Sequence, residues 1–308
     1  MKILFFSLSL VISCNPTFSQ PLGQRIKINN ADSLMREGNV PMAIAEYRKL
    51  YALYPLDSKI VYNYARALSV DNTVIKQFDS CFKYLNIAIS LDTSLSALTD
   101  PYFIHFREDS RWNEIEEKLI GLINDKIEIK DIEYAKVLWK LGAYDQAYFD
   151  EIMIAQKKLG MRSSVASAIW KLKSLIQEKN QAELEKIVKT KGWPKISNVG
   201  REAFMAAYLV AMHTNDGSQK KYLPMIKKSC QENELPWIRY ALIYDRCCFN
   251  DKKPQKYGTH TVYNEQTNTE ELYPMENDKK VDEWRKEIGL EPLSEYLSKM
   301  NIKYNSKK

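Results

Sequence analysis

The sequence lacks the short motifs that mark common catalytic sites. It contains no glycine-rich phosphate-binding loop and no Gly-x-Ser-x-Gly turn that would expose a nucleophile. Its three histidines, His105, His213 and His260, do not have the spacing of metal ligands on a helix, and no Cys-x-x-Cys pair occurs. We therefore expect no metal and no cofactor, and the sequence alone identifies no reaction.

Long apolar runs are also missing beyond the first turns of the chain, so no helix is expected to span a membrane. Glycine and proline are few, at 10 and 11 of 308 residues, which excludes a collagen. A hydrophobic content of 45% excludes a disordered chain. At roughly 150 residues per domain, the length predicts two domains.

No folded segment concentrates charge of one sign. The net charge is +6, but residues 21–122 are nearly balanced. A nucleic-acid-binding protein would gather basic residues on one folded face, so we expect no nucleic-acid partner. The excess lies in a basic tail, which contains Lys299, Lys303, Lys307 and Lys308.

The first twenty residues have the pattern of an export signal. A positive start at Lys2 precedes an apolar run that ends near Ser13. Two cleavage sites remain open. Residues 11–13 before Cys14 fit a lipoprotein box, which gives a signal of 1–13 and a lipid on Cys14. Small residues near position 19 instead fit a signal of 1–19 that is cleaved before Gln20.

Either cleavage predicts a protein in the periplasm or outer membrane of a Gram-negative bacterium. The protein is expected to contact the membrane only if Cys14 carries a lipid. Cys230 and Cys247 are expected at opposite ends of a helical hairpin, too far apart to bridge. We therefore expect mostly free, buried thiols, although an oxidising compartment permits disulfides.

Residues 21–122 show a helical repeat. From Gly38 to Pro55, the spacing of the small and apolar residues resembles that of the tetratricopeptide superfamily. A second, longer unit follows to Leu91, and a degenerate third begins at Asp100. The resemblance predicts stacked helical hairpins that bind a protein or peptide partner through residues 24–120. We expect the tyrosines of this region to fill the seams between repeats rather than line a groove; they are Tyr47, Tyr51, Tyr54, Tyr62 and Tyr64.

Residues 123–308 predict a second, mainly helical domain, and the fold class is all-α. Two helices are expected over 132–141 and 148–159, divided near Gly142. Two more are expected over 165–176 and 181–188, the second capped by Asn180. Residues 254–276 are polar, aromatic and rich in turn residues, which predicts an irregular loop or a short β-hairpin.

The later part of the chain resembles a bacterial family, domain of unknown function 6624, over roughly residues 130–300. Several motifs occur in order: Gly192-Trp193-Pro194, Ser197, Val199-Gly200, His213, Asp245-Arg246, Pro254–Thr259, Asp282–Arg285 and Gly289–Tyr296, with Asp145-Gln146 as a weaker upstream match. The resemblance implies a domain and candidate positions, and it carries no activity.

Four residues are candidates for a catalytic or ligand site: His213, Asp245, Arg246 and Tyr257. A neighbouring Asp245 could orient the His213 ring, and Arg246 could hold a carboxylate or phosphate. Gln255 and Thr259, with Arg246, are the candidate ligand-binding residues. The same residues could instead form a polar cluster that anchors the irregular segment, and we favour this structural role.

Two functions follow from these features. The first is an exported cell-envelope protein whose helical repeats form a platform for protein–protein interaction, fused to an uncharacterised helical domain. The alternative is an enzyme or small-ligand receptor with the His213/Asp245/Arg246/Tyr257 site.

Overall fold

The computed structural model describes residues 22–71, 76–93, 96–124, 128–214, 217–264, 266, 269–302 and 304. The predicted export signal, Cys14 and the last lysines lie outside these residues. The described chain is mainly helical with one small antiparallel sheet, which confirms the all-α prediction. It falls into two compact units that meet between Val210 and Ala211. No described helix is long and apolar enough to cross a bilayer.

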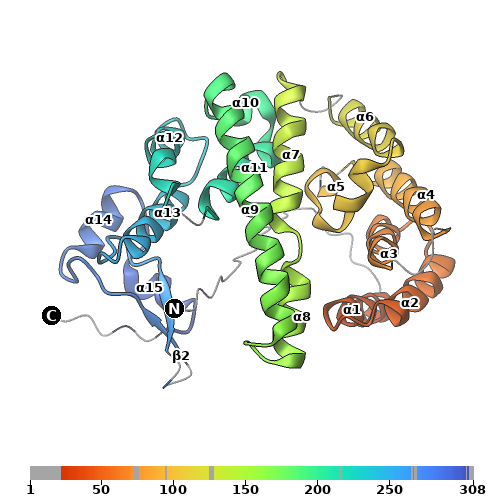
Figure 1. Cartoon of the computed structure of the whole chain (residues 1–308), viewed down its shortest axis with the longest axis horizontal. Coiled ribbons are helices and arrows are strands. Elements are labelled where there is room, and N and C mark those ends of the chain that lie inside the picture. The colour runs from red at the N-terminus through yellow and green to blue at the C-terminus, as the bar shows by residue number, and fades with distance from the viewer. Residues whose placement is uncertain are drawn as a thin grey trace. The chain divides into compact units, whose positions relative to one another are not determined.

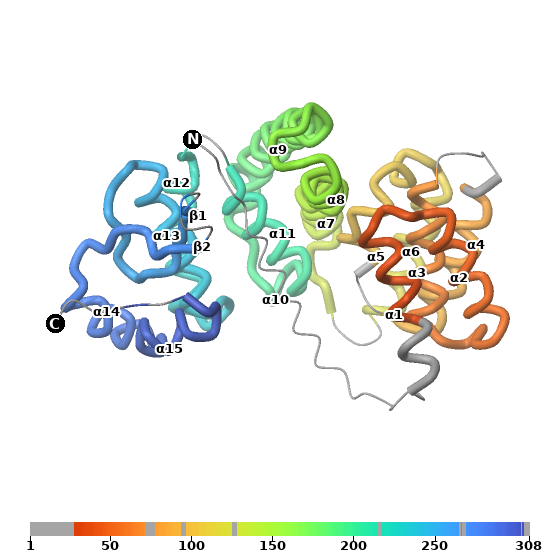
Figure 2. The backbone as a smooth tube through the Cα atoms, turned by 90° about the horizontal axis from the view of Figure 1, so that it is seen from below, coloured from red at the N-terminus to blue at the C-terminus, as the bar shows by residue number. Residues whose placement is uncertain are grey.

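Helical hairpins stacked side by side begin the first unit (Figures 1 and 2). Gly38, with φ at +72°, ends the first helix, and Ala31 and Ala43 are fully buried where the two helices approach. The assignment to the tetratricopeptide superfamily stays a prediction. The elements are α1 (Leu22–Arg36), α2 (Val40–Leu53), α3 (Ser58–Val70), α4 (Lys76–Leu91), α5 (Ser96–Thr99), the 3₁₀ helix η1 (Pro101–Glu108) and α6 (Arg111–Asn124).

Tyrosines fill a seam in this array. The Tyr84 ring lies 5.0 Å from Tyr51 and 4.5 Å from Tyr64, so α2, α3 and α4 meet through aromatic contacts. Such edge-to-face and tilted pairs add to the apolar burial between helices.

The same unit continues beyond residue 123. The domain boundary at 122/123 stays a prediction. Two of the expected helix ends are wrong. Gly142 lies inside α7 because its missing side chain lets α7 approach Ala206 of α11. Asn180 lies inside the long helix α9, where its amide donates to the carbonyl of Leu141. The elements are α7 (Ile132–Gln146), α8 (Phe149–Leu159), α9 (Ser164–Lys191), α10 (Ile196–Val199) and α11 (Arg201–Met212).

The helix predicted over residues 165–176 lies inside α9, and its apolar side chains are only partly buried. Ala166 is fully buried, whereas Leu172 and Leu175 are exposed. Lys173, between them in the sequence, is buried.

The second unit packs helices around the hairpin predicted near 254–276. Strands β1 and β2 pair antiparallel, with Thr261 opposite Leu272. Val281, Leu293 and Leu297 form a small apolar core beside the hairpin. The elements are α12 (Gln219–Gln231), α13 (Trp237–Asn250), β1 (Thr261–Asn264), β2 (Thr269–Leu272), α14 (Val281–Glu287) and α15 (Leu293–Ser298).

The close approach at Gly142 generates a prediction. A Cβ at Gly142 would lie 2.7 Å from the Cβ of Ala206, whereas a Cβ at Gly121 of α6 would meet nothing within 4 Å. Gly142→Ala should lower the free energy of unfolding by about 1–3 kcal/mol through overpacking. Gly121→Ala should raise it by about 0.5–1 kcal/mol. Urea unfolding of both variants measures the difference, and equal effects would contradict the close packing.

Candidate functional site

A small pocket lies in the first unit, where α3 and η1 meet the turn between α7 and α8. Its volume is about 160 Å³, and its walls include aromatic rings and several polar side chains. The polar residues are Ser69, Tyr102, His105, Gln146, Tyr148, Asp150 and Glu151. The first three come from α3 and η1 and the last four from the α7–α8 segment, so the site depends on both.

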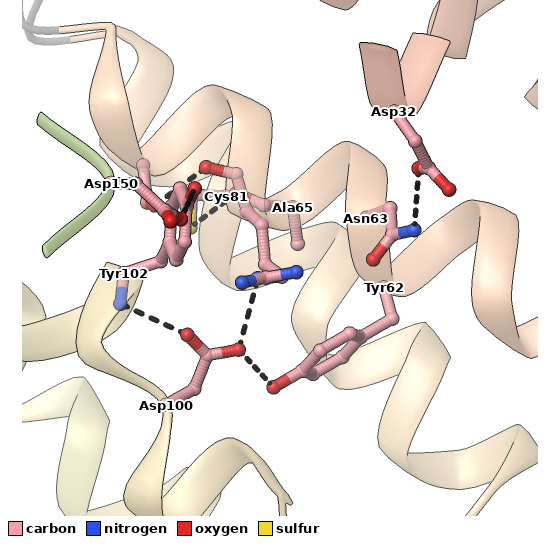
Figure 3. A network of polar contacts seen from close by, with 10 residues as sticks. Asp32, Tyr62, Asn63, Ala65, Cys81, Asp100, Tyr102 and Asp150 are labelled. Carbon is pink, nitrogen blue, oxygen red and sulfur yellow. Dashed lines mark hydrogen bonds and ion pairs between the residues drawn. The ribbon is translucent and has the colours of Figure 1, made fainter. Parts of the chain in front are cut away.

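Asp100 fixes the repeat side of the pocket (Figure 3). Its carboxylate caps η1 by accepting from the Tyr102 amide at 2.9 Å. It also accepts from the Tyr62 hydroxyl at 2.6 Å and pairs with Nε of Arg66 at 3.1 Å. The Arg66 guanidinium lies 4.1 Å from the centre of the Tyr102 ring. This network ties α3 to η1 and holds the Tyr102 ring in place.

Two contacts join the repeat side to α8. The Tyr102 hydroxyl donates to Asp150 at 2.7 Å, which Figure 3 shows from close by. The Tyr148 hydroxyl lies 3.4 Å from Nε2 of His105. Burial raises the pKa of Tyr102, and the nearby Asp150 carboxylate raises it further. The phenol therefore stays protonated and keeps donating.

Lys173 of α9 holds the turn on the other side. Its buried ammonium donates to the carbonyls of Asp145 and Ala147, the second at 3.0 Å, and lies 3.9 Å from the centre of the Phe149 ring. These carbonyls are at the end of α7, where intrahelical partners run out. Burial lowers the pKa of Lys173 to about 8. Tyr148 follows with φ at 67°, a left-handed conformation that costs a bulky residue of order 1 kcal/mol.

Glu151 is a half-buried carboxylate in the pocket wall with no described hydrogen bond to another side chain. Its described hydrogen bonding is limited to its own amide. Burial raises the pKa of Glu151, and the adjacent Asp150 carboxylate raises it further, whereas His105 and Lys173 lower it. A positive group in the pocket would favour the charged form of Glu151 and offset the free-energy cost of partly burying that carboxylate.

The predicted C-terminal candidates are brought together only in part. The buried Asp245 carboxylate accepts from the backbone amides of Lys256, Tyr257 and Thr259, between 2.9 and 3.2 Å, and from the Thr259 hydroxyl at 2.8 Å. Burial raises the pKa of Asp245, and these hydrogen bonds oppose the rise. No hydrogen bond of Asp245 reaches His213 within the described chain.

The other candidate residues, Gln255, Arg246 and His213, also lie in or near the protein interior. The Gln255 amide donates to the carbonyls of His260 and Tyr273 and accepts from the His260 amide. Burial lowers the pKa of His260 to about 4, with a smaller contribution from the nearby Arg246 charge. His213 is half-buried just beyond α11.

Arg285 completes the anchoring of the irregular segment. Its fully buried guanidinium donates to the carbonyls of Tyr257 at 2.6 Å and Glu291 at 2.7 Å. The guanidinium carbon lies 4.8 Å from the centre of the Tyr296 ring. Asp245 and Arg285 therefore hold opposite polar groups of the loop around Tyr257.

Among the described residues, no three His, Cys, Asp or Glu side chains lie close enough together to bind a metal ion. Cys81, Cys230, Cys247 and Cys248 are free, and the first three are buried. Burial raises the pKa of Cys230 and of Cys247 to about 11, so neither is a reactive thiolate near neutral pH.

Sequence reasoning missed the pocket residues His105, Tyr148 and Glu151. One signal could have indicated the site: Lys173 interrupts an apolar helical face, and a buried lysine needs oxygen partners nearby. Asp145-Gln146 already stood out as an upstream match to the family.

The fold defines a mainly helical protein. Its N-terminal helical array, α1 to α6, is followed by the α7–α8 segment that forms one wall of the pocket. The chain belongs to a family of unknown function, DUF6624, which matches residues 141–308. The match includes the α8 side of the pocket and the Asp245 cluster. Comparison with curated proteins and with solved structures gave no match.

The Asp245 contacts generate a prediction for the second unit. Asp245→Asn should lower the free energy of unfolding by about 3 kcal/mol, because one charged acceptor is lost and an amide NH₂ faces backbone donors. Asp251→Asn is the matched control. It breaks an ion pair with Lys220 of 2.6 Å at the surface, which should cost less than about 1 kcal/mol. Urea unfolding measures both, and equal costs would contradict the anchoring role.

Proposed function

We propose that the protein is exported to the bacterial cell envelope and that its helical array recognises a protein or peptide partner. The pocket between η1 and α8 takes a cationic side-chain end of that partner, from lysine or arginine. The Glu151 carboxylate carries this proposal, because it faces a pocket without a described partner beyond its own amide.

The chemistry of the pocket wall supports a cation. Asp150 and Glu151 place two carboxylates side by side, and Tyr102, Tyr148 and Phe149 add aromatic rings. Carboxylates give charge-assisted hydrogen bonds to ammonium or guanidinium groups, and aromatic faces attract the same cations. The pocket is too small for more than the end of a side chain, so affinity must also come from contacts along the array.

The second candidate function, catalysis or small-ligand binding at His213, Asp245, Arg246 and Tyr257, has less support. Asp245 is occupied by the loop, and Tyr257 presents its backbone to Asp245 and Arg285. A general acid–base site needs a carboxylate or imidazole that can reach a substrate.

Export predicts a processed N-terminus. Mass spectrometry of the protein from a Gram-negative envelope fraction should give either an acylated chain that begins at Cys14 or an unmodified chain that begins at Gln20. The first result establishes a lipoprotein and the second an ordinary signal cleavage. A chain that keeps Met1 and stays in the cytoplasmic fraction would contradict export.

The cation pocket predicts a charge-specific loss of binding. Peptide pools that differ only in one central residue should bind best when that residue is Lys or Arg, and worst when it is Glu. Glu151→Gln should weaken binding of the Lys and Arg pools by about tenfold, the value of one charge-assisted contact. Glu178→Gln removes the same charge from an exposed position on α9 and should have no effect. Binding that ignores the central residue would refute the cation pocket.

A further inference from the structure

The α8–α9 hairpin has an unusual charge pattern. Between Glu151 and Glu178 the sequence contains no acidic residue. Lys157, Lys158 and Arg162 surround the turn of the hairpin, and all three are exposed. Lysines in the last turn of a helix are common because they interact with the helix dipole. The acid-free stretch runs from the second turn of α8 to the middle of α9, which is longer than the helix dipole explains.

Apolar side chains are exposed on the same hairpin. Leu159 and Met161 at the turn are 58% and 46% exposed, and Val165 in the first turn of α9 is also exposed. The stripe continues along α9 through Leu172, which is seven residues after Val165 and therefore on the same face, to Leu175.

The turn projects from the unit. A Cβ at Gly160 would meet no atom within 4 Å, and its φ of +93° makes a sharp reversal between the antiparallel helices seen in Figures 1 and 2. Apolar side chains at such a tip can insert between lipid headgroups. Basic residues beside an inserted apolar edge favour anionic lipid.

We propose that the tip of the α8–α9 hairpin docks on an anionic phospholipid surface, with Leu159, Met161 and Val165 inserted and Lys157, Lys158 and Arg162 at headgroup level. The docking is peripheral, since no described helix crosses a bilayer. If the lipoprotein cleavage is the one used, it adds a second membrane contact to the lipid on Cys14. It does not rest on the proposed peptide recognition, because the pocket lies at the other end of α8.

Co-sedimentation with vesicles tests the proposal. The exported chain carries Cys14→Ser in every sample, so no acyl chain distinguishes the variants. The protein should pellet with vesicles of phosphatidylcholine and phosphatidylglycerol, and much less with phosphatidylcholine alone. The double variant Leu159→Ser, Met161→Ser should lower the partition coefficient by about tenfold. Lys157→Glu, Lys158→Glu should lower it as much, as should added salt.

Matched controls separate docking from stability. Leu53→Ser, Leu56→Ser changes two leucines that are 59% and 79% exposed near the α2–α3 turn, and it should pellet like the parent chain. The conservative swap Leu159→Met, Met161→Leu should restore binding. A parent chain that stays in the supernatant with both vesicles overturns the proposal and points to an acidic protein partner instead. Equal pelleting of the parent and the serine variant at the tip also overturns it.

Discussion

The buried ammonium of Lys173 is the constraint on which the architecture of the first unit depends. A charge removed from water must find oxygen partners, and the available ones are the carbonyls at the end of α7. Their capture ends α7 at that point and fixes the reversal into α8. Tyr148 then takes a left-handed conformation, and the next residues, Phe149 to Glu151, face the pocket. The pocket is thus a consequence of how one lysine is satisfied.

The second unit uses the same principle with other groups. Asp245 accepts from amides of the loop that follows α13, and Arg285 donates to carbonyls of that loop and of the turn before α15. In each case a buried charge is solvated by the backbone of an irregular segment instead of by an opposite charge. This arrangement fixes the path of a segment that has few regular hydrogen bonds, because breaking it leaves an uncompensated charge in the interior.

The sequence predicted the helical class, the early hairpins and the β-hairpin because these depend on local periodicity and turn residues. The sequence-based prediction of helix ends was wrong where contacts between residues distant in sequence determine them. Asn180 has the composition of a cap, but its amide is satisfied by Leu141 across the interface, so the helix continues. Gly142 has the composition of a break, but α11 packs against it. The Asp245 cluster was found through its motif. The pocket was not, since its two walls lie some forty or more residues apart in sequence and only the weak Asp145-Gln146 match falls beside it.

The length of α9 sets a geometric relation between the two surfaces of the first unit. A helix rises about 1.5 Å per residue, so Lys173 lies roughly 14 Å along α9 from Ser164 at the turn. If the turn rests on a bilayer, Lys173 can lie no more than about this distance above the point of contact. A ligand bound in the pocket would then lie within about two headgroup layers of the lipid surface.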